Sequence, residues 1–343
     1  MLLLIIFLAV LFGLCLMMIH MILPWLFGPM IAAATISKIS GRTIIWPKSL
    51  ADSGLFILGA QIGTTFTWQV LTDIRKDLFH IILLNILIIG AAILLSFIYR
   101  KMTRCSYETA LLSAVPGALS QMIVMAEENK RADLLAVTLS QTSRLLFVVM
   151  IVPFIASFGR GGNTGGVMHS DAIFQVLSFD RLLFIISLTG LFFLLLRRIH
   201  FPVPQLLAPI FIVSGWNIAT GVSFSIPYVW IAAAQLLFGV RIGLQLVELS
   251  SSLSLRLFFG IAVQNILLIL VTFIAAVMMT GHPFNDVFLS LAPGGMAQII
   301  IVALETGGNI AMISSYHIFR IFFILLIVAP LMQVMLKRFD KTI

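Results

Sequence analysis

Long apolar stretches, separated by short polar segments, run through the whole chain. Most of them reach the roughly 20 residues that a membrane-spanning helix needs. In the first half the stretches are 2–19, 25–37, 53–68, 79–99, 109–126 and 133–157. In the second half they are 181–196, 203–215, 227–247, 257–280, 287–304 and 310–336. The pattern predicts an all-α integral membrane protein.

Composition supports this interpretation and excludes a soluble fold. The 343 residues are 61% hydrophobic and only 10% charged, with a mean hydropathy of +1.14. A soluble core cannot hide so many apolar side chains. Residues 1–19 have no basic leading segment and no small-residue cleavage site, so we expect a first span or signal anchor.

The net charge of +8 resides mainly in short loops between the apolar stretches. This placement favours contact with anionic lipid headgroups and gives no support for nucleic-acid binding. The two cysteines, Cys15 and Cys105, lie in an apolar stretch and in a basic loop, so no disulfide is expected. No metal-binding, nucleotide-binding or nucleophile motif stands at usable spacing, so we expect neither a cofactor nor an enzyme.

One composite motif occurs twice, about 177 residues apart. The first copy comprises Pro116, Gly117, Ser120, Gln121, Glu128, Gln141 and Arg144. The second comprises Pro293, Gly294, Gly295, Gln298, Glu305, His317 and Arg320. Two further segments match at an offset of 180, namely 24–29 with 204–209 and 58–63 with 238–243.

These matches predict two internal repeats. The first occupies 1–158, a glycine-rich linker follows at 159–179, and the second repeat occupies 180–337. A short C-terminal tail, 338–343, remains.

The distribution of Lys and Arg favours an inverted arrangement of the repeats. In this arrangement the fifth stretch of each half enters and leaves on the same side, which gives about ten full spans. Only Arg75, Lys76, Arg160 and Arg181 then lie outside, and the other loop and terminal basic residues lie in the cytoplasm. The alternative, in which all twelve stretches cross, spreads these charges more evenly. Inverted repeats with broken helices are typical of secondary transporters.

Arg144 and Arg320 stand about ten residues inside long apolar helices. A charge there costs at least about 2.5–3.5 kcal/mol on insertion scales, so each needs a partner. Two roles are compatible: binding an anion, or tying helices together through carbonyls or through Glu128 or Glu305. Gln141 and His317 precede the arginines by three residues and share their helix faces.

Each Pro-Gly pair breaks a helix and frees backbone polar groups. A helix that restarts after the break points its positive end at the break, which favours an anion. Ser120, Gln121 and Gln298 lie in that first turn. A plain kink satisfied by neighbouring helices is the alternative.

Other polar positions are weaker candidates. His317 suits either a proton relay or a hydrogen-bonded packing role. Arg241 and Gln245 are four residues apart, and Gly239 and Gly243 beside them favour close helix packing.

The doubled Pro-Gly-[Gly/Ala] turn, the acidic residue after it and the later arginine resemble the AbrB-type family of bacterial membrane proteins. The segments 26–30 and 240–243, Leu-Phe-Gly-Pro-Met and Val-Arg-Ile-Gly, are also similar to that family. The resemblance implies inverted repeats with discontinuous helices, a distant similarity to cation/proton antiporters and anion transporters, and a frequent label as regulators of gene expression.

We therefore expect a secondary transporter of a small anionic or polar metabolite in the bacterial inner membrane, with both termini cytoplasmic. The lipid bilayer and an unidentified small molecule are the expected partners, and a homodimer is expected by analogy. The alternative is a membrane-embedded sensor that regulates gene expression without transport.

Overall fold

The computed structural model describes residues 2–41, 44–117, 119–158, 173–222, 224–279 and 281–341. Within these residues the chain is helical and contains no β-strand, as the sequence predicts. The helices of the first half are α1 (Leu2–Met18), α2 (Pro24–Ser40), α3 (Lys48–Thr64), α4 (Trp68–Thr103), α5 (Tyr107–Ala114), α6 (Leu119–Glu128) and α7 (Leu134–Phe158).

The helices that follow are α8 (Ile173–Val176), α9 (Phe179–Arg198), α10 (Pro204–Thr220), α11 (Tyr228–Ser252), α12 (Leu255–Met278), α13 (Phe284–Leu291), α14 (Met296–Thr306), α15 (Ile310–Phe323) and α16 (Ala329–Lys341). A π-helical turn, η1 (Ile324–Val328), joins α15 to α16 directly before Pro330. Most of the expected linker, 159–172, lies outside the described residues.

Six helical segments of the described chain are long and apolar enough to cross a membrane. They are α4, α7, α9, α11, α12 and the continuous segment Ile310–Leu336. The chain is therefore a multi-pass membrane protein. α1, α2, α3 and α10 have 17 residues each. A 17-residue helix is about 26 Å long, slightly short of a hydrocarbon core of about 30 Å, so the count of ten spans stays a prediction.

α4 begins earlier than the apolar pattern indicates. The sequence places a loop between the stretches 53–68 and 79–99, yet the helix already starts at Trp68 and runs for 36 residues. No proline or glycine interrupts 68–89, and Arg75 and Lys76 are good helix formers. The polar turns at 73–77 therefore extend the spanning helix.

Helix contacts divide the chain into two units. Unit 1 comprises Met1–Arg75, Gly162–Ser250 and Ile300–Ala311, and unit 2 comprises Lys76–Gly161, Ser251–Ile299 and Met312–Ile343. The first unit thus takes the opening helices of both halves, and the second takes the closing helices of both.

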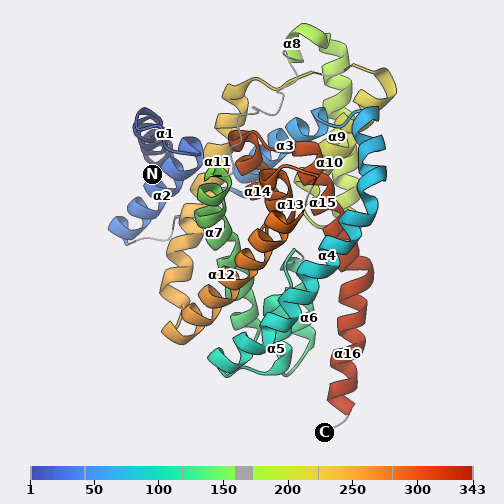
Figure 1. The fold of residues 1–343 in the computed structure, drawn as a ribbon. Helices are drawn as coiled ribbons and strands as arrows, with labels where there is room; N and C mark the ends of the chain where they lie inside the picture. The colour runs from blue at the N-terminus through green and yellow to red at the C-terminus, as the bar shows by residue number, and fades with distance from the viewer. Residues whose placement is uncertain are drawn as a thin grey trace. The chain divides into compact units, whose positions relative to one another are not determined.

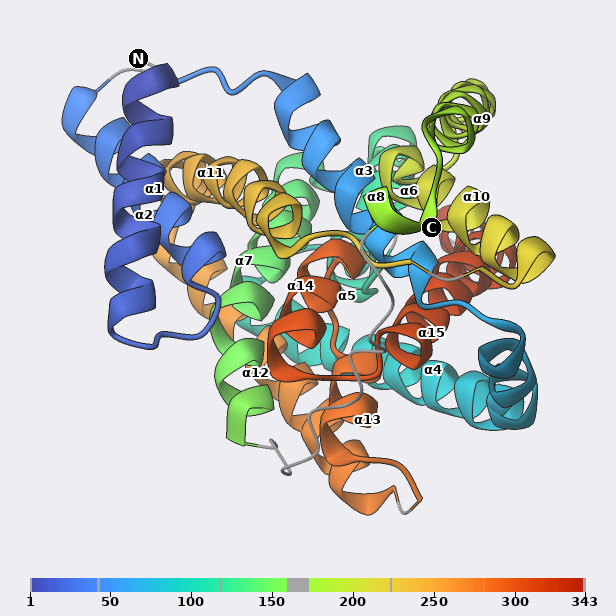
Figure 2. The same cartoon turned by 90° about the horizontal axis from the view of Figure 1, so that it is seen from above.

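In unit 1, α1 packs along α2 (Figure 2), and α10 packs against α3 and α9. Glycines permit backbone contact at these crossings. A Cβ atom added to Gly243 of α11 would collide with the carbonyl oxygen of Met30 in α2, and one added to Gly59 would collide with that of Leu206. Gly243 thus has the close-packing role expected for it.

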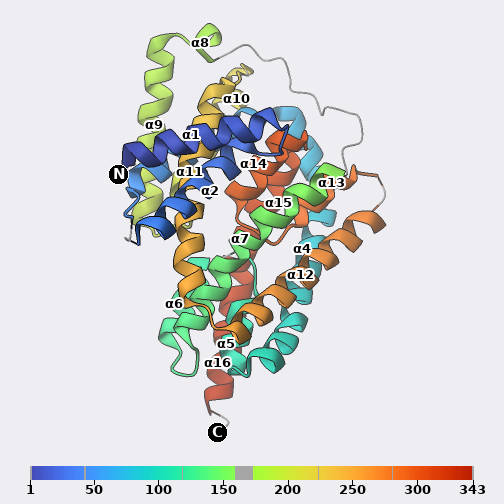
Figure 3. The same ribbon diagram turned by 90° about the vertical axis from the view of Figure 1, so that its left-hand side faces the viewer.

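In unit 2, α7 packs against α12, α13 and the broken pair α5 and α6 (Figures 1 and 3). The start of α5 lies beside the loop after α6. The Ser106 hydroxyl donates to the Arg131 carbonyl at 2.7 Å, and the Asp133 amide donates to the Thr109 hydroxyl at 2.9 Å. The two ends of this broken segment are therefore joined by hydrogen bonds.

The glycine contact in α11 gives a direct test of the packing. We expect Gly243→Ala to lower the free energy of unfolding by about 1–3 kcal/mol, because the methyl group has no space against the α2 backbone. The measurement is denaturant or thermal unfolding of the detergent-purified protein. Gly215→Ala is the control, since an added Cβ there meets no atom within 4 Å and helix propensity favours alanine. Equal losses in both variants would contradict this interpretation.

Candidate functional site

Both Pro-Gly segments break their helices, as the sequence predicts. α5 ends at Ala114 and α6 begins at Leu119, whereas α13 ends at Leu291 and α14 begins at Met296. Val115 (φ −66°, ψ 121°) and Ala292 (φ −49°, ψ 134°) end the first helix of each pair in extended conformations. Each precedes a proline, whose ring disfavours helical backbone at the preceding residue.

Arg144, on α7, binds the backbone carbonyls at the C-terminal end of α5, the first helix of the broken pair. It is 2% exposed. Its terminal nitrogens donate to the carbonyls of Ser113 at 2.6 Å, Ala114 at 2.9 Å and Val115 at 3.0 Å. These carbonyls are left without helical partners where α5 stops, and the negative end of the helix dipole favours a cation there.

Arg320, on α15, occupies the equivalent place at the end of α13 and is 1% exposed. Its terminal nitrogens donate to the carbonyls of Ser290 and Ala292, both at 2.8 Å. Within the described residues, all hydrogen-bond partners of both guanidinium groups are carbonyl or amide oxygens. Of the two predicted ways to tie the helices together, these bonds match the one through carbonyls. Neither Glu128 nor Glu305 takes part in them.

An asparagine completes each arginine site from a distant helix. Arg144 Nε donates to Asn265 Oδ1 at 3.2 Å, and Arg320 Nε donates to Asn85 Oδ1 at 2.9 Å. Each asparagine amide is oriented by a bond to its own helix, to the carbonyls of Ile261 and Ile81. Sequence reasoning missed Asn85, although it lies 180 residues before Asn265, at the offset of the other matched segments.

The polar residues one turn before the arginines also bind the broken helices. Gln141 donates to the carbonyls of Leu112 at 2.7 Å and Val115 at 3.0 Å, and its Oε1 accepts from Arg144 at 3.2 Å. His317 donates through Nε2 to the Leu289 carbonyl at 3.0 Å. Both side chains are buried and therefore help to hold α5 and α13 in place.

Each turn packs against the arginine helix of the other half. A Cβ atom added to Gly117 would meet Ile324 at 3.2 Å and the Arg320 side chain at 3.4 Å. One added to Gly294 would meet Val148, on the Arg144 helix, at 2.5 Å. Pro116 and Pro293 beside them are buried. The structure thus brings both turns and both arginines together within unit 2.

The residues that open α6 and α14 differ in exposure. Gln298 is buried at 6% exposure, and its side chain lies against Gly295. Gln121 is half-buried and Ser120 is exposed. The second turn is therefore the more enclosed of the two.

The hydrogen bonds that hold the broken helices do not involve the weaker candidates Glu128, Glu305, Arg241 and Gln245. Glu128 is exposed at the end of α6. Glu305, in unit 1, accepts from Gln235 at 3.0 Å and Tyr228 at 3.4 Å, both on α11. Arg241 and Gln245 are half-buried on α11 in the same unit.

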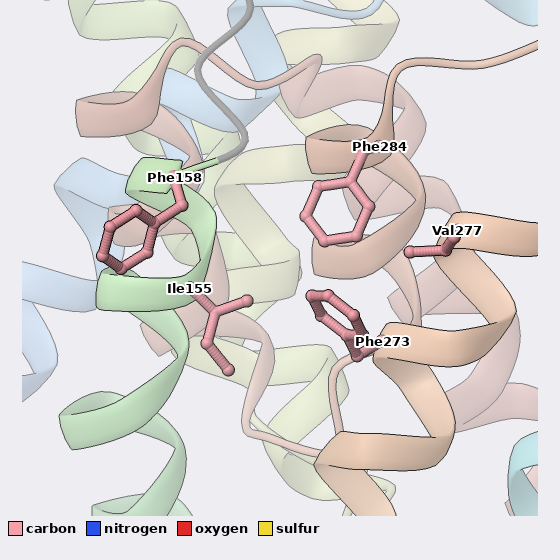
Figure 4. Close-up of a pocket in the computed structure, with 5 residues that line it drawn as sticks. All are labelled: Ile155, Phe158, Phe273, Val277 and Phe284. Atoms are coloured by element: carbon pink, nitrogen blue, oxygen red, sulfur yellow. The ribbon is translucent and has the colours of Figure 1, made fainter.

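An apolar cavity of about 440 Å³ lies elsewhere in unit 2, where α7, α12 and α13 meet. Figure 4 shows Phe273 and Phe284 facing Ile155 across it. Val277 and Phe158 complete the lining, which contains no charged side chain. In the described part of the chain, no group of three or more His, Cys, Asp or Glu side chains could hold a metal ion.

Comparison with known proteins extends over nearly the whole chain. A family model described as "Transition state regulatory protein AbrB" matches residues 25–336. A protein of Escherichia coli (strain K12) named "Putative regulator AbrB" is 24% identical over 315 residues, which cover 90% of this chain and 88% of that protein. The "Uncharacterized protein YhjN" of Bacillus subtilis (strain 168) is 23% identical over 335 residues, which cover 89% and 85%.

The asparagine acceptors are testable by a double-mutant cycle. We expect Asn85→Leu to lower the free energy of unfolding by about 1–3 kcal/mol, because a buried Arg320 N–H loses its acceptor. The double variant with Arg320→Met should lose less than the sum of the two single variants. Thr272→Val is the control, because its buried hydroxyl bonds only a carbonyl of its own helix. Simple additivity in the cycle would refute the coupling.

Proposed function

The chain belongs to the AbrB family, and on this premise we propose that it is a secondary transporter of a small anionic or polar metabolite. The observation that carries the proposal is the doubled arrangement in unit 2. Two helices break inside apolar sequence, and each break is held by a buried arginine. Broken helices at equivalent places in two halves of a membrane protein are typical of transporter substrate sites.

Matching local geometry supports two repeats, 1–158 and 180–337. α2 and α10 have equal length, both begin at a proline and both follow a residue of left-handed backbone, Leu23 (φ 59°) and Val203 (φ 47°). Both also end at a left-handed glycine, Gly41 and Gly221. The bonds of Arg144 to α5 also recur in the bonds of Arg320 to α13, where the arginines are 176 residues apart and their carbonyl partners 177. Duplicated sequence with duplicated geometry favours a repeat.

The hydrogen bonds that join the ends of the α5–α6 segment support a re-entrant path. A segment whose start and end lie together enters and leaves on one side of the membrane. With one such segment in each half, every half crosses an odd number of times, so the second half is inverted. The two breaks then approach the site from opposite faces, as alternating access requires.

The charges at the breaks favour an anionic substrate. The guanidinium groups of Arg144 and Arg320 are buried, and their partners among the described residues are all neutral oxygens. Their positive charge adds to the positive ends of α6 and α14 beside them. Ser120, Gln121 and Gln298, in the first turns of those helices, are the candidate residues for orienting the charged group or the rest of the ligand.

Regulation of gene expression is the second candidate, favoured by the names "Transition state regulatory protein AbrB" and "Putative regulator AbrB". In that role the same site senses a ligand, and the cytoplasmic loops or residues 337–343 pass the signal to a partner. For either role we place the chain in the bacterial inner membrane with both termini cytoplasmic, as a homodimer.

Side-specific labelling tests the re-entrant path. In a variant without native cysteines, Lys101→Cys and Lys130→Cys should react with an impermeant maleimide from the same side of the membrane. Arg75→Cys, beyond the α4 span, should react from the opposite side. All three replaced residues are exposed. Labelling of Lys130→Cys together with Arg75→Cys would mean that α5 and α6 cross the membrane.

Flux measurements test transport. Proteoliposomes loaded with carboxylates, amino acids or phosphate should show counterflow of one class, and Arg320→Ala should reduce that flux at least about tenfold, because a buried charged contact is lost. Arg198→Ala, at the exposed end of α9, is the matched control and should keep full flux. The absence of flux for every class, together with loss of regulation on deletion of 337–343, would favour the sensor.

A further inference from the structure

The two buried arginines differ in how many of their N–H groups are bonded. A guanidinium group carries five N–H donors. Arg144 makes five hydrogen bonds, so every donor is used. Within the described residues Arg320 makes three, one from each nitrogen. Each terminal nitrogen of Arg320 therefore keeps one N–H without an acceptor in a site that is 1% exposed.

The sequence explains part of this difference. Arg144 gives one of its additional bonds to Gln141 Oε1 and the other to the Ala114 carbonyl. In the second copy the place of Gln141 is taken by His317, whose Nε2 is used on the Leu289 carbonyl. The remaining ring nitrogen, Nδ1, can accept a hydrogen bond, but the three bonds of Arg320 within the described residues do not include it.

A second unbonded group lies at the same break. The Gln298 side chain makes no hydrogen bond within the described chain, and the residue as a whole is 6% exposed. Its Oε1 and Cδ lie where a Cβ atom of Gly295 would be, so the amide rests against the turn. Its counterpart in the first half, Gln121, is half-buried.

The electrostatics at this break also favour an anion. No carboxylate in the described part of the chain bonds the buried Arg320 guanidinium. The positive N-terminal end of the 11-residue helix α14 begins two residues before Gln298. A carboxylate that binds an arginine through both oxygens accepts two N–H groups from separate nitrogens, and Arg320 has two such groups unbonded. The Gln298 amide adds an uncharged donor.

We propose that a substrate carboxylate binds in the second copy alone, to the two unbonded N–H groups of Arg320 and to Gln298. Arg144 then holds the end of α5 without touching the ligand. This inference rests on the proposed function and names its substrate class. Because Arg320 is buried, the carboxylate enters when the turn at Gly294 and Gly295 opens, and glycine allows the backbone rotations that this needs.

A reciprocal exchange of the two residues that precede the arginines tests the asymmetry. His317→Gln gives Arg320 the amide acceptor of the first copy, and Gln141→His, the matched control, removes it from Arg144. Binding of acetate, succinate and inorganic phosphate to the full-length purified protein is measured by calorimetry and thermal shift, with chloride as the reference salt. The wild type should bind the carboxylates, and His317→Gln and Gln298→Leu should each weaken binding at least about tenfold.

In Gln141→His the dissociation constant should stay within about twofold of wild type. Size-exclusion chromatography and the unfolding temperature without anion identify variants that fail to fold. If His317→Gln or Gln298→Leu fails to fold, Arg320→Lys takes its place. Equal effects in the two exchange variants, an unchanged affinity in His317→Gln, a response to phosphate alone or no anion response would each overturn the proposal.

The same variants separate this inference from transport itself. Carboxylate binding that depends on Arg320, without flux in proteoliposomes, would leave the inference intact and overturn the transport proposal. Flux that is equally sensitive to both exchange variants would leave transport intact and overturn the asymmetry.

Discussion

The bonds between the two arginines and the carbonyls of the broken helices determine the rest of the site. A helix that stops inside the membrane leaves its last carbonyls without partners, and each such group costs several kcal/mol in hydrocarbon. A buried guanidinium has the matching need, because its donors have no water to bind. At the ends of α5 and α13 the guanidinium groups supply donors to these carbonyls, and among the described residues only Arg144 has all of its own donors bonded in return. The breaks are therefore stable only while the arginines remain in place.

This mutual dependence extends across both halves of the chain within unit 2. The asparagines bind the arginines from α12 and α4, and the glycine turns contact Ile324 and Val148, on the helices that carry the opposite arginines. A shift of either turn must therefore move the arginine helix of the other half or break its contacts. Under the proposed transport function, such coupling would let one opening motion rearrange both sides of the site, as alternating access requires.

The sequence predicts those parts of the fold that depend on local chemistry. Apolar length predicts the long helices, the Pro-Gly pairs predict the breaks, and a charge inside an apolar helix predicts a bonded arginine. The polar start of α4 is not predicted, because helix propensity continues past the apolar face there. The Asn85–Arg320 bond joins residues 235 positions apart, and such pairs depend on tertiary packing that no local pattern contains. Only the offset of 180 residues to Asn265 could have indicated it.

The crossed asparagine bonds also bear on how such a chain could have arisen. Each arginine takes its Nε acceptor from the other half, at separations of 121 and 235 residues. A single half, expressed alone, holds an arginine and an asparagine that are not each other's partners. Two copies of one half, packed in opposite orientations, would complete both sites at once. The bond pattern is thus the one expected if gene duplication and fusion joined an ancestral antiparallel dimer into one polypeptide.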